Sequence, residues 1–127
     1  MIAAHDFYEN EFARFWMANG ILFFEYKPET IINLEVAKSV VADRIFFQKE
    51  KAYPICCDVR GVIDTEKAGR DYLAKFGSLL TKAVGLLADE EVTLTISNFY
   101  LQVNKPVVPT QIFTKKEEAL LFLKGYL

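Results

Sequence analysis

The sequence predicts an α/β domain in which four helices flank a mixed five-stranded sheet, and three observations carry this prediction. Asn19-Gly20 is a strong two-residue turn signal, because both positions tolerate positive φ, and aromatic segments that favour strands flank it. Residues 53–59 have an unbroken apolar middle, which is typical of a parallel central strand buried on both faces. From there to the end, strand-like and helix-like segments alternate, so the predicted order is ββαβαβαβα.

The first elements are a hairpin and a helix. The hairpin joins residues 11–17 to residues 21–26, and Pro28 ends its second strand. The helix spans residues 34–48, and Asn33 is its N-cap, because an Asn side-chain oxygen accepts from the free amides of a first turn.

The later elements continue the alternation after the third strand. A second helix begins at Thr65 and ends before Gly77, and residues 82–88 form the fourth strand. Residues 110–113 form the fifth strand. Thr114-Lys-Lys-Glu117 matches the capping box, so it predicts the start of the last helix.

Residues 92–104 fit two patterns. Taken alone, their alternation of apolar and polar residues indicates a strand. Parallel neighbours need a crossover of about a dozen residues, usually helical, and the acidic residues 89–91 suit a helix N-terminus. The sequence therefore favours a helix. Its predicted buried stripe consists of Val92, Ile96, Phe99 and Val103.

Size and composition bound the class of protein. The chain has 127 residues, of which 52% are hydrophobic and 14% aromatic, so we expect one domain with a sizeable core and a loosely held tail over residues 1–10. The 15 basic and 17 acidic residues give a net charge of −2 without a basic stripe, which argues against nucleic-acid binding. No apolar run has the length of a membrane span, and no signal peptide is recognisable, so the expected location is the cytoplasm.

Few residues offer metal or nucleophilic chemistry. Cys56 and Cys57 are strand neighbours that point to opposite faces, so we expect two small buried hydrophobes, with redox sensing as the alternative. His5, the only histidine, lies in the predicted tail. Catalytic triads and zinc sites need histidines or ligand clusters that the fold holds in place, so we expect no metal site, no cofactor and no catalytic residue.

A polar corner follows the third predicted strand. In open α/β sheets, functional groups gather where the carboxyl end of a strand meets a helix N-terminus. Thr65 is a candidate helix cap or phosphate acceptor at this corner, since free amides at a helix start hold a phosphate. Asp58 and Asp64 are the carboxylates that an enzyme would use here, although structural capping is the favoured role. The corner residues are Asp58, Arg60, Asp64, Thr65, Lys67 and Arg70.

Two further groups are candidates for binding. Asn98 and Lys105, near the end of the predicted third helix, are placed to line a cleft. Phe46, Leu94 and Leu101 fall on the outward sides of their predicted helices, where neighbouring apolar residues would form an association patch. Such a patch predicts a homodimer or a contact with another protein.

Arg44 interrupts the apolar arc of the first predicted helix. Burying an unpaired guanidinium is costly, so we expect its head group to reach solvent while its stem packs on apolar surface. The alternative is an ion pair with a partner chain or an anionic ligand.

Several short segments of the sequence resemble those of a known family. They are Pro54-Ile-Cys-Cys-Asp-Val-Arg-Gly-Val62, Asn98-Phe-Tyr, Asn104-Lys-Pro-x-x-Pro109, and Ile112-Phe-Thr with Glu118-Ala-Leu-x-Phe-Leu123. Together with the element order, they resemble the STAS domain, the fold of bacterial anti-sigma-factor antagonists and of sulfate-transporter tails. The similarity covers about Phe12 to Tyr126. It is strongest to small stand-alone bacterial STAS-like proteins, which some schemes group with the CRAL-TRIO lipid-transfer fold.

The resemblance implies a site and a function. Antagonists of this fold are phosphorylated on a Ser or Thr at the start of the second helix, and Thr65 lies nearest to that position. Asp58-Val-Arg-Gly61 is similar to the preceding word of the antagonists, whereas Asp64-Thr-Glu-Lys67 stands where they carry Asp-Ser-Ser-Gly.

The resemblance favours a non-catalytic regulatory module that binds a protein partner or itself, in a bacterial cytoplasm. The alternative is a binder of small apolar or amphipathic, lipid-like ligands in the manner of CRAL-TRIO proteins. An enzyme that uses Asp58 and Asp64 is the third hypothesis.

Overall fold

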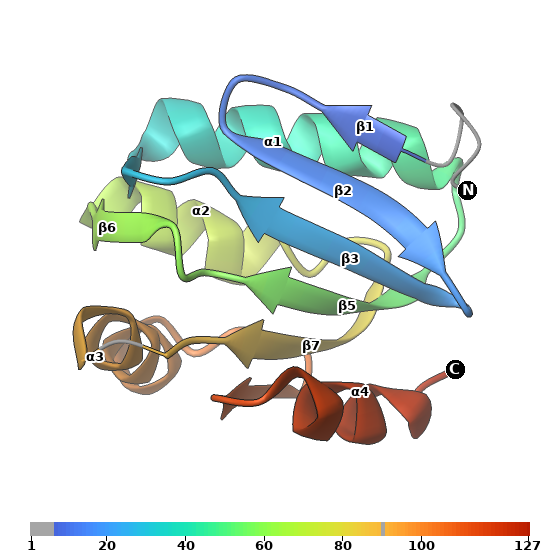
Figure 1. The fold of residues 1–127 in the computed structure, drawn as a ribbon. Coiled ribbons are helices and arrows are strands. Elements are labelled where there is room, and N and C mark those ends of the chain that lie inside the picture. The colour runs from blue at the N-terminus through green and yellow to red at the C-terminus, as the bar shows by residue number, and fades with distance from the viewer. Residues whose placement is uncertain (1–6, 90) are drawn as a thin grey trace.

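In the computed structural model, which describes residues 7–89 and 91–127, a six-stranded sheet forms the centre of the molecule (Figure 1). The strand order is β1-β2-β3-β5-β7-β8; the first two pairings are antiparallel and the other three are parallel. Strands β4 and β6 form a separate parallel pair. The bounds are β1 Phe7–Glu9, β2 Ala13–Ala18, β3 Ile21–Tyr26, β4 Thr30–Ile32, α1 Leu34–Gln48, β5 Tyr53–Asp58, β6 Val62–Thr65, α2 Lys67–Phe76, β7 Thr81–Leu87, α3 Glu91–Phe99, the π-helical turn η2 Tyr100–Asn104, β8 Thr110–Phe113 and α4 Lys116–Lys124.

The helices cover the two faces of the sheet unequally. Helices α1 and α2, together with α3 and η2, lie on one side, which we call the inner face. Helix α4 lies on the opposite side, the outer face, and packs against β5, β7 and β8 (Figure 1). Among the described residues, no helix covers the outer surface of β1 and β2, and α4 reaches only the near side of β3, where Lys116 lies over the Phe23 ring.

Local signals explain the elements that form as expected. Asn19 and Gly20 turn the β2–β3 hairpin with φ values of 53° and 80°, as the turn chemistry predicts. The Asn33 side chain accepts from the N–H of Val36 at 2.8 Å and caps α1, which has the predicted bounds. Strand β5 pairs in parallel with both of its neighbours, so the central-strand prediction is confirmed.

The sheet has six strands instead of the predicted five, because part of the expected tail joins it. Phe7 pairs with Trp16 in register, and Asn10 closes the following turn by accepting from the N–H groups of Phe12 and Ala13 at 2.8 Å and 2.9 Å. The expectation of a loosely held tail is therefore wrong for residues 7–10. His5, which was expected in that tail, lies outside the described residues.

Two predicted helix caps are wrong. Thr65 is the last residue of β6 and pairs with Ile32 of β4, so α2 begins only at Lys67, after Glu66. The β4–β6 pairing extends the chain through Thr65 before it can coil. Helix α4 begins at Lys116 after Lys115, and no side chain caps it, so Thr114 does not form the predicted capping box.

The crossover over residues 91–104 is helical, as predicted, but its buried face is rotated from the predicted stripe, of which only Ile96 packs against the core. Val92, Phe99 and Val103 are 55%, 45% and 57% exposed, whereas Thr93 and Ser97 are only 2% and 3% exposed. Helix α3 packs against β6 and β8, where small hydroxyl residues allow close approach. The π-helical turn η2 then rotates the following residues relative to an α-helical wheel.

This rotation removes the predicted association patch. Leu94 and Leu101 pack against the buried core and do not face outward. Phe46 does face outward, with 84% of its surface exposed on α1, but it stands apart from the other two. A single exposed apolar side chain is ordinary at a protein surface.

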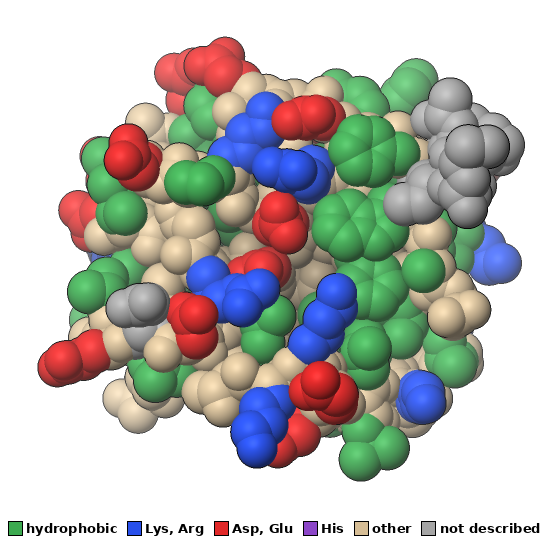
Figure 2. Space-filling model, in the orientation of Figure 1, with side chains coloured by type: hydrophobic (Ala, Val, Ile, Leu, Met, Phe, Trp, Pro, Cys, Tyr) green, Lys and Arg blue, Asp and Glu red, His purple; other side chains and the backbone are tan. Residues whose placement is uncertain are grey.

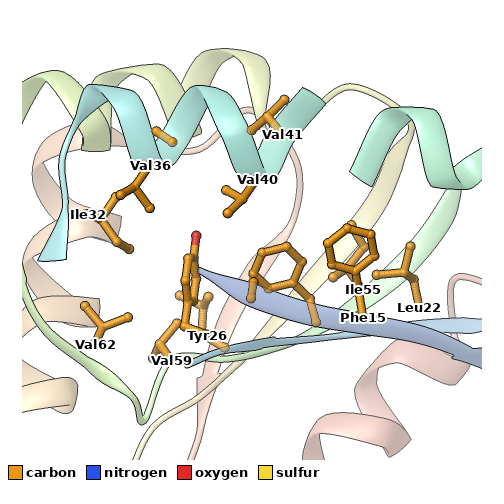
Figure 3. Packing of buried hydrophobic residues seen from close by; sticks show 14 of the residues in the cluster. Phe15, Leu22, Tyr26, Ile32, Val36, Val40, Val41, Ile55, Val59 and Val62 are labelled. Carbon is orange, nitrogen blue, oxygen red and sulfur yellow. The ribbon is translucent and has the colours of Figure 1, made fainter. Parts of the chain in front are cut away.

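Stacked aromatic rings fill the core beneath α1. Phe15 has no exposed surface, and its ring stacks on Tyr8 at 5.1 Å and on Phe24 at 5.4 Å. The ring of Phe47 from α1 meets it edge-on at 5.3 Å. Figure 3 shows Phe15 beside Leu22 on the sheet, under the helix that carries the buried valines of α1.

Candidate functional site

The structure divides the predicted polar corner. Arg60 binds Asp58 in bidentate fashion, through Nε to Oδ1 at 3.0 Å and Nη2 to Oδ2 at 2.8 Å, and its Nη1 lies 3.8 Å from Asp89. Asp64 is exposed and accepts from the backbone N–H of Thr65 at 2.8 Å. Each carboxylate thus has its own structural partner, and the fold does not bring Asp58 and Asp64 together as an acid–base pair.

The Asp58–Arg60 pair borders the uncovered part of the outer face, where two rows of side chains cross the strands. Phe7 lies opposite Trp16 and Trp16 opposite Phe23, and the three rings stack with centroids 6.5 Å and 5.7 Å apart. We call these three residues the aromatic row. Phe7 is exposed, whereas Trp16 and Phe23 are half-buried. Figure 2 shows hydrophobic side chains gathered over these strands.

An ionic row runs beside the aromatic row. Two residues farther along each strand, the register places Glu9, Arg14, Glu25 and Asp58 opposite one another. Arg14 Nε lies 3.3 Å from Glu25 Oε1, and Lys27 Nζ lies 2.8 Å from Glu9 Oε2. Acidic and basic side chains therefore lie next to the partly exposed rings of the aromatic row on one face (Figure 2).

The other corner residues lie toward α2 and η2, where they form a clamp. Arg70 donates through Nη1 to the Thr65 hydroxyl at 3.0 Å and through Nε to Asn104 at 3.2 Å. Asn104 donates in turn to Asp71 at 2.6 Å, and Lys67 donates to the same carboxylate at 2.7 Å. These bonds tie the start of α2 to the end of η2.

The clamp has aromatic and electrostatic support. The Arg70 guanidinium lies 4.8 Å from the centre of the Phe99 ring, a cation–π contact. The hydrogen bond from Lys67 lowers the pKa of the Asp71 carboxyl below its ordinary value. The carboxylate therefore stays ionised at neutral pH and keeps accepting from Asn104.

A cavity of about 120 Å³ lies on the inner face, between the sheet and helices α1, α2 and α3. Thr65 and Arg70 line it, and most of its wall is apolar. Asn98 and Lys105, the predicted cleft residues, do not line it: Asn98 is exposed and donates back to the carbonyl of Leu94 at 3.0 Å. The neighbouring residues Ser97 and Pro106 line it instead.

Arg44 also lines this cavity and is only 4% exposed, so the expectation that its head group reaches solvent is wrong. It donates to the Gln48 side chain, to the carbonyl of Leu79 at 3.2 Å and to the carbonyl of Gly77 at 3.0 Å. Burial lowers its pKa to about 10, so the guanidinium remains charged at neutral pH.

The two cysteines point to opposite faces, as predicted. Cys56 packs under α4, whereas Cys57 lines the cavity, which leaves part of its surface accessible. Burial raises the pKa of Cys56 to about 11 and raises the pKa of Cys57 further.

We expect both thiols of the folded protein to resist Ellman's reagent at pH 8. Only about one Cys56 thiol in a thousand is ionised when the pKa is three units above the pH, and the thiolate is the reactive form. Both thiols should react once guanidinium chloride unfolds the chain. If the folded protein promptly released one equivalent of thionitrobenzoate from the reagent, one thiol would be reactive, and redox sensing would be supported instead.

The sequence signal for the aromatic row was present but incomplete. Trp16 and Phe23 were assigned to strands, but their shared face follows only from the strand register. Phe7 was placed in the tail. The Arg70–Asn104–Asp71 contacts join residues more than thirty positions apart, which no local pattern indicates.

This architecture, a mixed sheet that begins with a hairpin and continues with parallel strands, is the STAS-like, or SpoIIAA-like, fold. An uncharacterised DUF3478-family protein with a SpoIIAA-like fold from Shewanella loihica is 13% identical, with a TM-score of 0.57 over 91% of this chain and 98% of that one. An anti-sigma factor antagonist from Mycobacterium paratuberculosis is 16% identical, with a TM-score of 0.56 over 98% of this chain and 99% of that one.

The family can be stated more closely. The chain belongs to DUF7793, a domain of unknown function, whose family model matches residues 15–127. Comparison with curated proteins found no match. Within the part of the chain that the structure describes, no helix combines the length and apolarity that crossing a membrane requires.

Proposed function

We propose that this protein is a non-catalytic regulatory module that binds a protein partner through the uncovered outer face of its sheet. The observation that carries the proposal is the aromatic row, Phe7, Trp16 and Phe23, which stacks across three strands. Among the described residues, α4 meets it only at Phe23, through Lys116. The likeness of the fold to an anti-sigma factor antagonist, a protein named for its regulatory role, supports it.

The surface has the chemistry of a protein interface. Aromatic side chains supply large, rigid contact area and are enriched at interface centres, while a polar rim surrounds them. Here the ionic row provides such a rim. The side chains of Arg14 and Glu25 are 41% and 36% exposed. Alternating charges favour a partner whose surface carries the complementary pattern of charges over a partner of uniform charge.

The proposal predicts site-specific crosslinking from the aromatic row. A photoreactive phenylalanine analogue placed at Trp16 should yield one defined crosslinked protein band in the source cells. The same analogue at Phe46 is the matched control, because that side chain is 84% exposed and lies on α1, which covers the inner face. Mass spectrometry of the band identifies the partner. A band at twice the chain mass indicates a second copy, as the homodimer expectation has it.

Equal labelling from both positions, or none from Trp16 in cells that hold the folded protein, would count against this surface. Analytical ultracentrifugation of the purified protein separates the two kinds of partner. A dimer that Trp16→Ser dissociates and Phe46→Ser leaves intact assigns the face to self-association. A monomer assigns it to another protein.

Thr65 is the residue at which we propose that phosphorylation regulates the module. Its hydroxyl accepts from Arg70, and a phosphate there would attract this guanidinium away from Asn104 and loosen the clamp. Intact mass of the protein from its source cells should show one phosphate that Thr65→Ala removes and Thr110→Ala does not. A single unmodified mass across growth conditions would end this proposal.

The cavity favours a second function, the binding of a small apolar or amphipathic ligand. Its wall is mostly apolar with a few polar groups, which is the usual composition of a ligand pocket. A cavity of roughly 150 Å³ holds one benzene molecule, so a site of about 120 Å³ suits a compound near that size rather than a whole lipid. Native mass spectrometry of the freshly purified protein would reveal a retained compound.

A further inference from the structure

The inner-face cavity contains a cation without a counter-ion. No carboxylate among the described residues pairs with Arg44, and its partners are the neutral oxygens of Gln48, Gly77 and Leu79. The carbonyls of Gly77 and Leu79 follow the C-terminal end of α2, which supplies only about half a negative charge. The buried guanidinium is therefore hydrogen-bonded but not neutralised.

Arg44 also has donors to spare. A guanidinium carries five N–H groups. The bonds within the described part of the chain use two on Nη1 and one on Nη2. Nε and the second Nη2 hydrogen remain on a side chain that lines the cavity and is 4% exposed.

Two phenols complete the polar part of the cavity. Tyr26 is 5% exposed and lines it, and its hydroxyl has no hydrogen-bond partner among the residues that the structure describes. Figure 3 shows this hydroxyl pointing toward α1, between Ile32 and Val40, which also line the cavity. Tyr100, from η2, is the second phenol in the wall.

Burial keeps both phenols of the cavity in the neutral form. Burial raises the pKa of Tyr26 well above its ordinary value, and the charge of Arg44 acts in the opposite direction on it. Both phenols are therefore neutral donors at physiological pH. The pKa of Tyr100 is likewise raised by burial.

We propose that this cavity binds a small monocarboxylate with an apolar body about the size of one ring. The carboxylate would accept from the spare N–H groups of Arg44 and from the hydroxyl of Tyr26, and the body would lie among apolar side chains such as Val40 and Ile55. A carboxylate matches the fork of a guanidinium and supplies the missing charge. The other guanidinium of the wall, Arg70, is already bound to Thr65 and Asn104 and lies over the Phe99 ring. Arg44 alone therefore faces the ligand, which suits one negative charge rather than a phosphate.

This proposal rests on the second proposed function, ligand binding in the cavity, and names the class of ligand. The protein-binding surface lies on the other face of the sheet. The clamp residue Arg70 and the η2 residue Tyr100 both line the cavity. A bound carboxylate would therefore contact the same segment, η2, that the clamp holds against α2.

Three ring compounds of similar size and different charge test the proposal: benzoate, benzyl alcohol and benzylamine. Methyl NMR of the full chain should show benzoate shifting the signals of Val40 and Ile55 at millimolar or lower concentration. Leu121, which is 72% exposed on α4, is the control signal. Benzyl alcohol should bind at least tenfold more weakly and benzylamine not at all. Equal binding of the three, or no shift with benzoate, would overturn the proposal.

Variants assign the binding to the named groups. Tyr26→Phe removes one hydroxyl. It should weaken the binding of benzoate about tenfold and change the affinity for benzyl alcohol by less than about twofold. Arg44→Met should abolish benzoate binding, and Arg14→Met, a matched change on the outer face, should not affect it. Because Arg44→Met also removes structural bonds, Tyr26→Phe decides the outcome if that variant fails to fold.

The last part of the experiment varies the length of the ligand's apolar tail. Decanoate carries the same carboxylate on a long apolar chain, and we expect it to bind more weakly than benzoate. Tighter binding of decanoate would replace the proposed ring-sized ligand with a lipid-like one. Crosslinking from Trp16 does not involve the cavity, so failure here and failure of the protein-binding surface are distinguishable.

Discussion

Phe15→Ala is expected to lower the free energy of unfolding by about 4 kcal/mol, the usual range for truncating a fully buried phenylalanine. Phe15 has no exposed surface, and its ring contacts the rings of Tyr8, Phe24 and Phe47. Removing it leaves a cavity between β2 and α1 that rigid neighbours cannot fill. Urea unfolding followed by circular dichroism measures the loss.

The neighbouring residue supplies the control. Trp16 points to the outer face and is half-buried, so Trp16→Ala should cost only about 1 kcal/mol while removing the predicted crosslinking surface. The two substitutions, one residue apart, separate stability from binding. A larger loss from Trp16→Ala than from Phe15→Ala would contradict the assignment of the two faces.

Arg44→Met is expected to lower the free energy of unfolding by about 3 kcal/mol. Methionine fills similar volume, but it leaves the carbonyls of Gly77 and Leu79 and the Gln48 side-chain oxygen without the guanidinium donors, at about 1 kcal/mol or more each. Burial of the charge opposes this loss, because desolvation lowers the pKa of Arg44 to about 10. We expect the three hydrogen bonds to outweigh the desolvation penalty.

The sign of the Arg44 result is informative. Arg14→Met removes an arginine of the outer face that is 41% exposed, and should change stability by less than about 0.5 kcal/mol, as exposed ion pairs usually do. A stabilising Arg44→Met would mean that desolvation dominates. It would leave binding of an anion as the remaining reason for a buried cation at this position.

The two faces of the sheet thus have separate chemistry. The outer face carries partly exposed rings and alternating charges, whereas the inner face holds a cation beside an apolar cavity. The clamp of Arg70, Asn104 and Asp71 lies on the side of this cavity, where it joins α2 to η2 beside Thr65 at the end of β6.

Much of the fold could be predicted because its signals are local. The Asn19-Gly20 turn and the Asn33 cap act within four residues, and an apolar run such as β5 identifies itself by composition. The helical crossover over residues 91–104 was predicted from connectivity, because parallel β7 and β8 need one, and it overrode a misleading local alternation.

The site could be predicted only in part. Thr65, Arg70 and the Asp58–Arg60 pair were expected near the end of β5, but the sequence could not show that they lie in two separate environments. The β4–β6 pairing, which keeps Thr65 out of α2, joins residues about thirty positions apart. Arg44 was recognised as unusual, yet its carbonyl partners come from the turn after α2.

By itself, the sequence determined the helices, the five predicted strands and their order, because turns, caps and periodicity act over a few neighbouring residues. It did not reveal β1, β4 or β6, which form by pairing with other segments. Only the tertiary structure decided which face of α3 is buried, which strands lie uncovered and what surrounds Arg44. Those properties depend on contacts between distant segments, where packing and desolvation, not local preference, select one arrangement.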